Sequence, residues 1–162
     1  MLTRKLVEMA TKEEQRKKQK ELQQKMLAYR ILESRIDSLL KQREFLANKL
    51  VEMQTTLESI DEIEKSKEDV LFPLGSAAYT FGRVTDKNKM IVEVGADVAI
   101  EKNFTEARDI LNERKNDMEN VLTTVQRNIQ EASESLQMLE PQIQEMIQKQ
   151  QQSQRGVNEE AG

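Results

Sequence analysis

Apolar residues change their spacing twice along this chain, and the changes divide it into three parts. In residues 12–66 and 103–150 they recur every three or four positions, which is typical of an amphipathic helix. In residues 70–102 they instead alternate with polar or small residues, which is typical of a strand. The pattern predicts an α+β fold: two long helices joined by a β insert. We predict that residues 1–11 form an N-terminal extension and that residues 151–162, which have no period, form a disordered tail.

Both helical segments carry a heptad repeat. Nearly all of their a and d positions are apolar, and the exceptions Lys25 and Arg43 can cover the seam with their alkyl stems. We therefore predict a long antiparallel coiled coil in which the chain folds back on itself. Both termini then lie at the end away from the β insert, about 60–70 Å from it by the helical rise. The central seam residues are Leu32, Leu39, Leu46, Leu50, Leu122, Val125, Ile129 and Leu136.

The helix ends also have sequence signals. Thr11 with Glu14, and Asn103 with Glu106, have the spacing of a capping box, so each pair predicts a helix start. Pro141 lies on the outer face of the second repeat and should kink that helix or loosen a turn. The expected neighbours across the seam are Leu57 with Phe104 or Leu111, and Tyr29 with Ala132 or Leu139.

The β insert is too small to bury both of its own faces. Alternation and turn residues predict four strands, at 70–74, 77–84, 89–94 and 98–101, which pair as two hairpins. Exposed strand edges invite pairing with another chain, and closure into an intersubunit β-barrel would remove them. The alternative is a self-contained four-stranded sheet packed on the helix ends. The predicted assembly residues are Tyr79, Phe81, Val84, Met90, Val92, Val94, Val98 and Ile100.

Composition narrows the possible functions. One third of the residues are charged (33%) and only 4% are aromatic, so the chain cannot fill a round core and must bury a narrow seam instead. The absence of cysteine and histidine excludes the usual zinc, thiolate and imidazole chemistry, and no phosphate-binding glycine loop is present. We expect no cofactor, no metal and no enzyme activity. A net charge of −4 argues against nucleic acid as a partner. The sequence has no long apolar run, which argues against a membrane span and a secretion signal and favours a cytoplasmic protein.

Three stretches carry a family resemblance. PLGSAAYTFGRV, MIVEVGADVAIEKNFTEA and LEPQIQEM are similar to the corresponding parts of the alpha-type subunits of archaeal prefoldins. The resemblance covers nearly the whole chain, and the four predicted strands match the alpha type, because the beta type has one hairpin. It implies a heterohexamer of two alpha and four beta subunits, in which six coiled coils extend from a double β-barrel.

The resemblance further implies an ATP-independent chaperone that binds unfolded proteins with the tips of its coiled coils and passes them to a group II chaperonin. Methionine suits such binding because its flexible side chain adapts to varied partners. The alternatives are that the apolar residues near the C-terminus complete the seam, or that the chain is a coiled-coil dimerising scaffold without clients. The predicted client-binding residues are Leu2, Leu6, Val7, Met9, Met138, Ile143, Met146 and Ile147.

Overall fold

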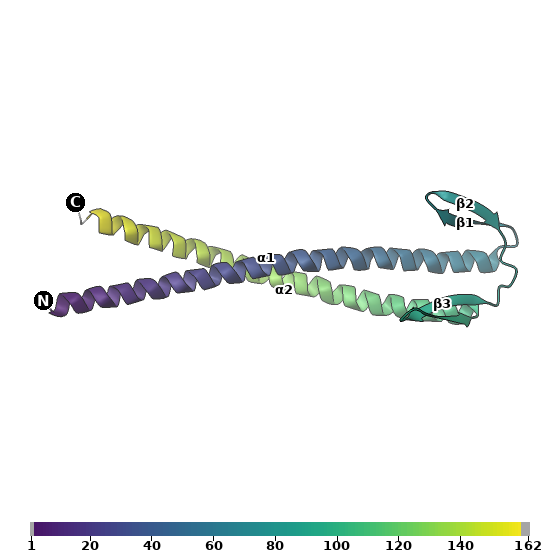
Figure 1. Cartoon of the computed structure of the whole chain (residues 1–162), viewed down its shortest axis with the longest axis horizontal. Helices are drawn as coiled ribbons and strands as arrows, with labels where there is room; N and C mark the ends of the chain where they lie inside the picture. The colour runs from purple at the N-terminus through teal and green to yellow at the C-terminus, as the bar shows by residue number, and fades with distance from the viewer. Residues whose placement is uncertain (1, 160–162) are drawn as a thin grey trace. The chain divides into compact units, whose positions relative to one another are not determined.

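The computed structural model has two long helices that are joined in sequence by two β-hairpins (Figure 1). It describes the backbone of residues 2–159 and the side chains of residues 9–152. In chain order the elements are α1 (Leu2–Lys65), β1 (Val70–Gly75), β2 (Ala78–Gly82), β3 (Met90–Gly95), β4 (Val98–Lys102) and α2 (Phe104–Glu159). The chain divides into two compact units: Arg43–Thr124 contains both hairpins, and the segments before and after it form the second unit.

Both helices extend further than the sequence analysis predicted. α1 begins at Leu2, so Thr11 lies inside the helix and does not cap it. The residues upstream of Thr11 are mostly good helix formers, and no glycine or proline interrupts them. α2 continues through the glutamine-rich stretch to Glu159, so the part of the predicted disordered tail from 151 to 159 is helical. Glutamine and arginine have high helix propensity, so loss of the heptad period does not require loss of the helix.

The start of α2 has the predicted capping box. The backbone N–H of Glu106 donates to Oδ1 of Asn103 over 2.8 Å, and the N–H of Asn103 donates to Oε2 of Glu106 over 3.3 Å. The carbonyl of Asn103 accepts the first helical bond from Ala107 over 2.9 Å. Two amide groups that a helix start leaves without partners are thereby satisfied, which fixes where the chain turns from β4 into α2.

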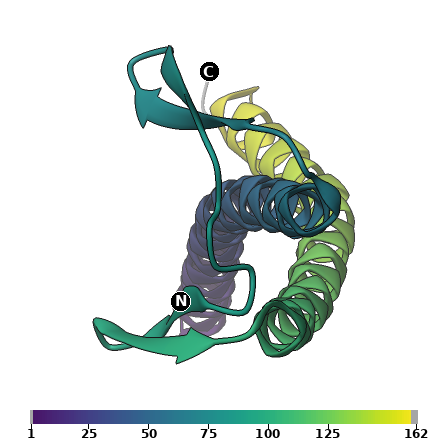
Figure 2. The ribbon, with the colours of Figure 1, turned by 90° about the vertical axis from the view of Figure 1, so that its right-hand side faces the viewer.

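Each hairpin is a separate two-stranded antiparallel sheet (Figure 2). Within the described residues the two hairpins do not pair with each other, so the self-contained four-stranded sheet considered above is not formed. Their registers are equivalent: Val70 pairs with Gly82 in one, and Met90 with Lys102 in the other. Each register shifts just before a glycine, Gly75 or Gly95, whose positive φ of 99° or 110° favours a residue without Cβ.

The tight turns of both hairpins contain residues other than glycine with positive φ, a conformation that such residues seldom adopt. Ser76 and Ala77 have φ of 49° and 59°, and Ala96 and Asp97 have φ of 50° and 59°. Positive φ at both central residues is the geometry of a type I′ turn, which matches the right-handed twist of the flanking strands. Asn-Gly is the usual sequence there, so both hairpins tolerate some backbone strain to obtain this tight connection.

The buried side chains form a narrow seam along the helices. Leu46 and Val125 are buried, and the other six central seam residues named above are half-buried. The tightest packing is in the unit that holds the hairpins, where Ile60, Phe104 and Ala107 are almost inaccessible to solvent. The most buried residues are Leu22, Leu46, Leu57, Ile60, Val92, Phe104, Ala107, Val125 and Ala132. A two-helix coil encloses its seam on few sides, which explains why most of its core is only partly buried.

Candidate assembly and binding surfaces

The first hairpin, β1–β2, has two chemically different faces. On one face Leu71 lies opposite Phe81 and Pro73 lies opposite Tyr79, and all four side chains are exposed. Phe81 retains 77% of its accessible surface. These two cross-strand pairs make an apolar face that nothing in the described chain covers.

The opposite face of the first hairpin is partly covered. Val70 and Phe72 are half-buried. A Cβ atom added to Gly82 would lie 3.0 Å from two ring carbons of Phe72, so this glycine leaves room for the phenyl ring. Packing of an aromatic ring over a strand glycine compensates for the missing side chain and holds the two strands together.

The second hairpin, β3–β4, buries one face within its own chain. Val92 is only 6% exposed, and its cross-strand partner Ile100 and the neighbouring Met90 are half-buried. On the other face Ile91 is 74% exposed and lies opposite Glu101. The face of this hairpin that remains open is therefore partly charged, unlike that of the first.

The predicted assembly residues fall into three groups. Four are exposed and available to a partner: Tyr79, Phe81, Val94 and Val98. Three are half-buried: Val84, Met90 and Ile100. Val92 is buried by its own chain, so it supports the hairpin that presents the surface. Three further exposed apolar residues of the same hairpins are absent from the predicted set: Leu71, Leu74 and Ile91. Leu71 could have been found from its pairing with Phe81 across the strands.

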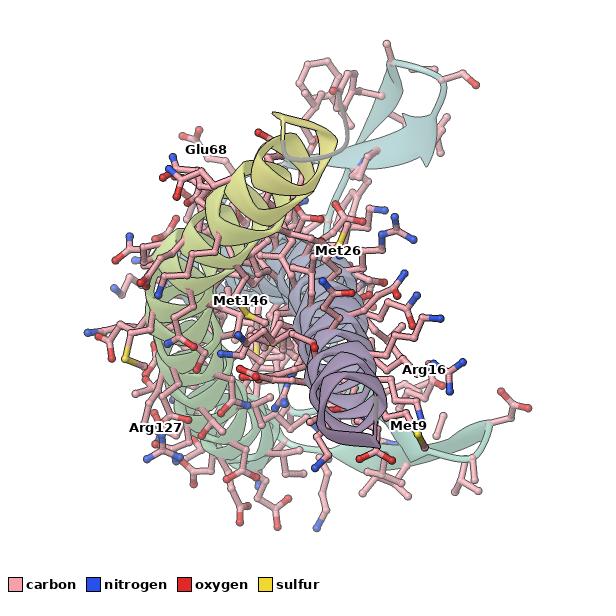
Figure 3. All side chains as sticks on the ribbon, turned by 90° about the vertical axis from the view of Figure 1, so that its left-hand side faces the viewer. Met9, Arg16, Met26, Glu68, Arg127 and Met146 are labelled. Atoms are coloured by element: carbon pink, nitrogen blue, oxygen red, sulfur yellow. The ribbon has the colours of Figure 1, made fainter. Side chains whose placement is uncertain are left out.

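The helices of the other unit enclose a groove of about 570 Å³. Leu22 and Met146 line it together with glutamine, lysine and glutamate side chains from both helices. Figure 3 shows Met146 between the two helices, whereas Met9 lies on the outside of α1. Nζ of Lys25 donates to Oε1 of Gln142 over 2.9 Å and lies 3.3 Å from Oε1 of Glu21, so this lysine links the helices beside the groove.

A second groove, of about 330 Å³, lies in the same unit around Tyr29. Met26 and Ile143 supply its apolar lining, and Glu140 and Glu33 supply acidic groups. The pKa of Tyr29 is raised, chiefly because its hydroxyl is partly removed from water and then because both glutamates disfavour the phenolate. Tyr29 therefore lies near Glu140, one position beyond the Leu139 that the heptads offered as its neighbour.

The predicted client-binding residues differ in accessibility. Met9 and Met138 are largely exposed, the latter at 63%, whereas Ile143, Met146 and Ile147 are half-buried. The side chains of Leu2, Leu6 and Val7 lie outside the described residues. Four further apolar residues of α1 are exposed in this unit and are absent from the predicted set: Met26, Leu27, Ile31 and Leu40. They lie off the heptad seam; Met26 lines the groove around Tyr29, whereas Leu27, Ile31 and Leu40 are simply exposed.

Ion pairs fix the helix register in the unit that carries the hairpins. Nη2 of Arg108 lies 2.8 Å from Oδ1 of Asp61 and 2.5 Å from Oε2 of Glu64. These contacts raise the pKa of Arg108, with the hydrogen bond to Glu64 as the largest cause. Further along the coil, Nζ of Lys115 donates to Oε1 of Gln54 over 2.8 Å. α1 and α2 are thus antiparallel, with the end of α1 beside the start of α2.

The described residues contain no cluster of acidic or other ligating side chains that could hold a metal ion. None of their helices combines the length and the apolar character needed to cross a membrane. What remains as functional surface is apolar: exposed hairpin faces in one unit, and grooves and exposed methionines in the other. These features define a class of two-helix coiled-coil proteins whose helices are joined by a pair of surface-exposed β-hairpins.

Comparison with known proteins identifies the family within this class. The family model described as "Prefoldin subunit" matches residues 32–149. Prefoldin subunit alpha of Pyrococcus horikoshii is 31% identical over 134 residues, which cover 81% of this chain and 90% of that protein. The same subunit of Nitrosopumilus maritimus is 29% identical over 136 residues, covering 83% and 94%. The chain therefore belongs to the prefoldin family of chaperone subunits, which are not enzymes, and the resemblance inferred from its sequence is confirmed.

Comparison of structures supports the fold. A chain in the cryo-EM structure of filamentous PFD from Methanocaldococcus jannaschii matches with a TM-score of 0.62 and 20% sequence identity, covering 71% of this chain and 97% of that one. The predicted pair of long helices with two hairpins between them is confirmed. Closure of the hairpins into an intersubunit barrel stays a prediction, because the structure contains one chain.

Proposed function

We propose that this chain is the alpha-type subunit of a cytoplasmic heterohexamer with beta-type prefoldin subunits, two alpha and four beta. In this assembly it captures unfolded proteins without ATP and delivers them to a group II chaperonin. Family membership supports the chaperone activity. The exposed apolar surfaces support separate roles for the hairpins and for the ends of the coiled coil. The hairpins serve assembly, and the ends of the coiled coil serve client capture.

The observation that carries the assembly role is the uncovered face of the first hairpin, Leu71, Pro73, Tyr79 and Phe81. Soluble proteins rarely leave such a contiguous apolar patch on strands open to water, and isolated two-stranded hairpins are marginally stable. Pairing with hairpins of other subunits would cover the face and the strand edges together. This supports assembly through the hairpins over the alternative of a scaffold that dimerises only through its helices.

Exposed methionines support client capture by the other unit. Met9 and Met138 present flexible, polarizable side chains to solvent, and the groove that contains Met146 surrounds an apolar floor with polar groups. Each such side chain offers at most about 1.5–3 kcal/mol on burial, so one arm binds a client weakly. Several arms on one hexamer would bind the same client by avidity and still release it to a chaperonin.

The test is protection of a chemically unfolded protein from aggregation by the assembled hexamer. The variant carries Met9→Ser and Met138→Ser. The control carries Val51→Ser and Val121→Ser, which also remove exposed apolar side chains from both helices but from the other unit. We expect the methionine variant to assemble normally and to protect less well, while the control protects like the unchanged protein. Equal protection by both variants contradicts capture at these methionines, and failure of all forms to protect without nucleotide favours the scaffold.

A further inference from the structure

The linker between the two hairpins, residues 83–89, is fastened to the end of α1. Nζ of Lys87 donates to the carbonyl oxygen of Glu64 over 3.2 Å and to that of Ser66 at shorter range. Lys87 is half-buried, although it lies in a linker whose neighbouring residues are mostly exposed. These contacts join residues more than twenty positions apart in sequence, so they constrain where the linker runs.

The two carbonyl groups that Lys87 contacts lie in the last turn of α1 and directly after it. The last four carbonyl groups of a helix lack intrahelical donors, and the partial negative charge they carry attracts a cation. One of them, that of Glu62, accepts the N–H of Ser66 over 2.8 Å. The ammonium group of Lys87 can donate up to three hydrogen bonds, and it donates to the carbonyl of Glu64 in this turn and to that of Ser66 just after the helix. Lys87, which is more than twenty positions away in sequence, thus caps the C-terminal end of α1.

Two further contacts converge on the same short stretch. Nε of Arg83 lies 3.0 Å from Oδ1 of Asp69, which ties the start of the linker to the segment that leads into β1. The side chain of Glu64 accepts Arg108 from α2 while its backbone carbonyl accepts Lys87. Glu64 is therefore the point at which α1, α2 and the linker are held together.

We propose that Lys87 is a positioning residue that sets the direction in which the β3–β4 hairpin leaves the coiled coil and so holds the two hairpins ready for assembly. This rests on the proposed role of the hairpins in assembly, but the contact itself acts within one chain. The seam of the coil does not involve Lys87, and the carbonyls it releases can turn to water. Loss of Lys87 therefore frees the hairpin without unfolding the helices.

The chain offers matched variants for the test. Lys87→Met removes the ammonium group and keeps a side chain of similar length, and Lys87→Arg keeps the charge and the donors. Lys89→Met makes the same change two positions away, where Lys89 pairs with Glu101 in an exposed ion pair of 3.3 Å. The sequence has no cysteine, so single spin labels can be placed on cysteines introduced at Glu58 of α1 and Glu93 of β3, both exposed.

The experiment measures the distance distribution between the two labels in the full-length chain. We expect one narrow distribution for the unchanged protein, for Lys87→Arg and for Lys89→Met, and loss of that narrow peak for Lys87→Met. The thermal midpoint of helix unfolding should be equal for the two methionine variants. A narrow peak retained by Lys87→Met overturns the proposal. A lower thermal midpoint for Lys87→Met also overturns it, because the lysine would then support the coil itself.

Assembly provides a second readout. If freeing the hairpin leaves about one chain in ten in the competent orientation, the apparent Kd for a purified beta-type prefoldin subunit rises about tenfold for Lys87→Met alone. Native mass spectrometry of a titration measures this change. A broadened distance distribution with unchanged affinity supports the contact within the chain and contradicts assembly through this hairpin, so the two ideas fail in different ways.

Discussion

The packing at the base of the coiled coil makes a quantitative prediction about stability. Ile60 of α1 is 3% exposed, and the ion pair between Asp61 and Arg108 sets it at the level of Phe104 and Ala107, which are buried on α2. Substitution of Ile60 by alanine removes three buried carbon atoms from this place. Few positions in so narrow a core are enclosed as fully, so this is where truncation should cost most.

The expected cost follows from the carbon atoms removed. At about 0.8 kcal/mol for each buried methylene, the transfer free energy amounts to roughly 2.4 kcal/mol. A residual cavity adds to this value, and Ile→Ala substitutions in protein cores generally cost about 2–5 kcal/mol. Two helices can close together more easily than a round core can, so the cavity contribution should be small. We expect the free energy of unfolding to fall by about 2.5–3.5 kcal/mol.

The assay is urea denaturation of the chain followed by circular dichroism at 222 nm, with Val51→Ala as the control. Val51 lies on the same helix and is 66% exposed, so its truncation should change stability by less than about 0.5 kcal/mol. The dependence on urea should be unchanged, because both variants expose the same surface on unfolding. If Ile60→Ala is no more destabilising than Val51→Ala, the base of the coil is not the tightly packed region described here.

Two further predictions concern assembly and pH. Phe81→Asp should leave the helix content of the chain unchanged but abolish assembly with beta-type subunits in sedimentation experiments, because a carboxylate would be buried without a partner. Thr85→Asp, in the exposed linker, is the control. Normal assembly of Phe81→Asp contradicts the hairpin interface. The pKa of Glu106 is lowered below its ordinary value of 4.5, first by the N–H of Asn103 and then by Lys102. The ionised carboxylate therefore contributes its full stability above pH 4.5, and this contribution is lost as the pH falls through the lowered pKa. Glu106→Gln keeps a capping side chain but cannot ionise. Thermal melts from about pH 6 to pH 3 should therefore show a smaller loss of stability for this variant than for the unchanged protein. Equal losses in the two proteins would refute this assignment.

The fold could be predicted from sequence because its two periodic patterns are long and unambiguous. A heptad repeat sustained through Leu32, Leu39 and Leu46 cannot be accommodated in a strand, and the alternation in the insert cannot be accommodated in a helix. The helix ends were less predictable, since heptads report the seam and not the helix. α1 begins before its first seam residue because no glycine or proline precedes Thr11, and α2 continues past its last seam residue although Gly156 lies within it.

The candidate surfaces were only partly predictable. Alternation identifies the two faces of a strand but not which face its own chain covers, so Val92 could not be distinguished from Phe81 before the hairpins were placed. Exposed apolar residues such as Leu27 and Ile31 break the helical pattern, and a search for departures from the heptad would have found them. The contact of Lys87 with the end of α1 depends on the path of a linker, which no local pattern encodes.

The two hairpins have the same backbone conformation but different exposed side chains, and this difference bears on how the chain assembles. Their registers and turn conformations correspond residue for residue, and Gly75 of the first is equivalent to Gly95 of the second. The pair Leu71 and Phe81 in the first corresponds to Ile91 and Glu101 in the second, so one open face is apolar and the other is partly charged. An apolar partner surface complementary to the first face would meet the ion pair between Glu101 and Lys89 if it docked on the second. We therefore expect the two hairpins to fit different partner surfaces, as the proposed hetero-oligomer requires and a closed dimer of identical chains does not.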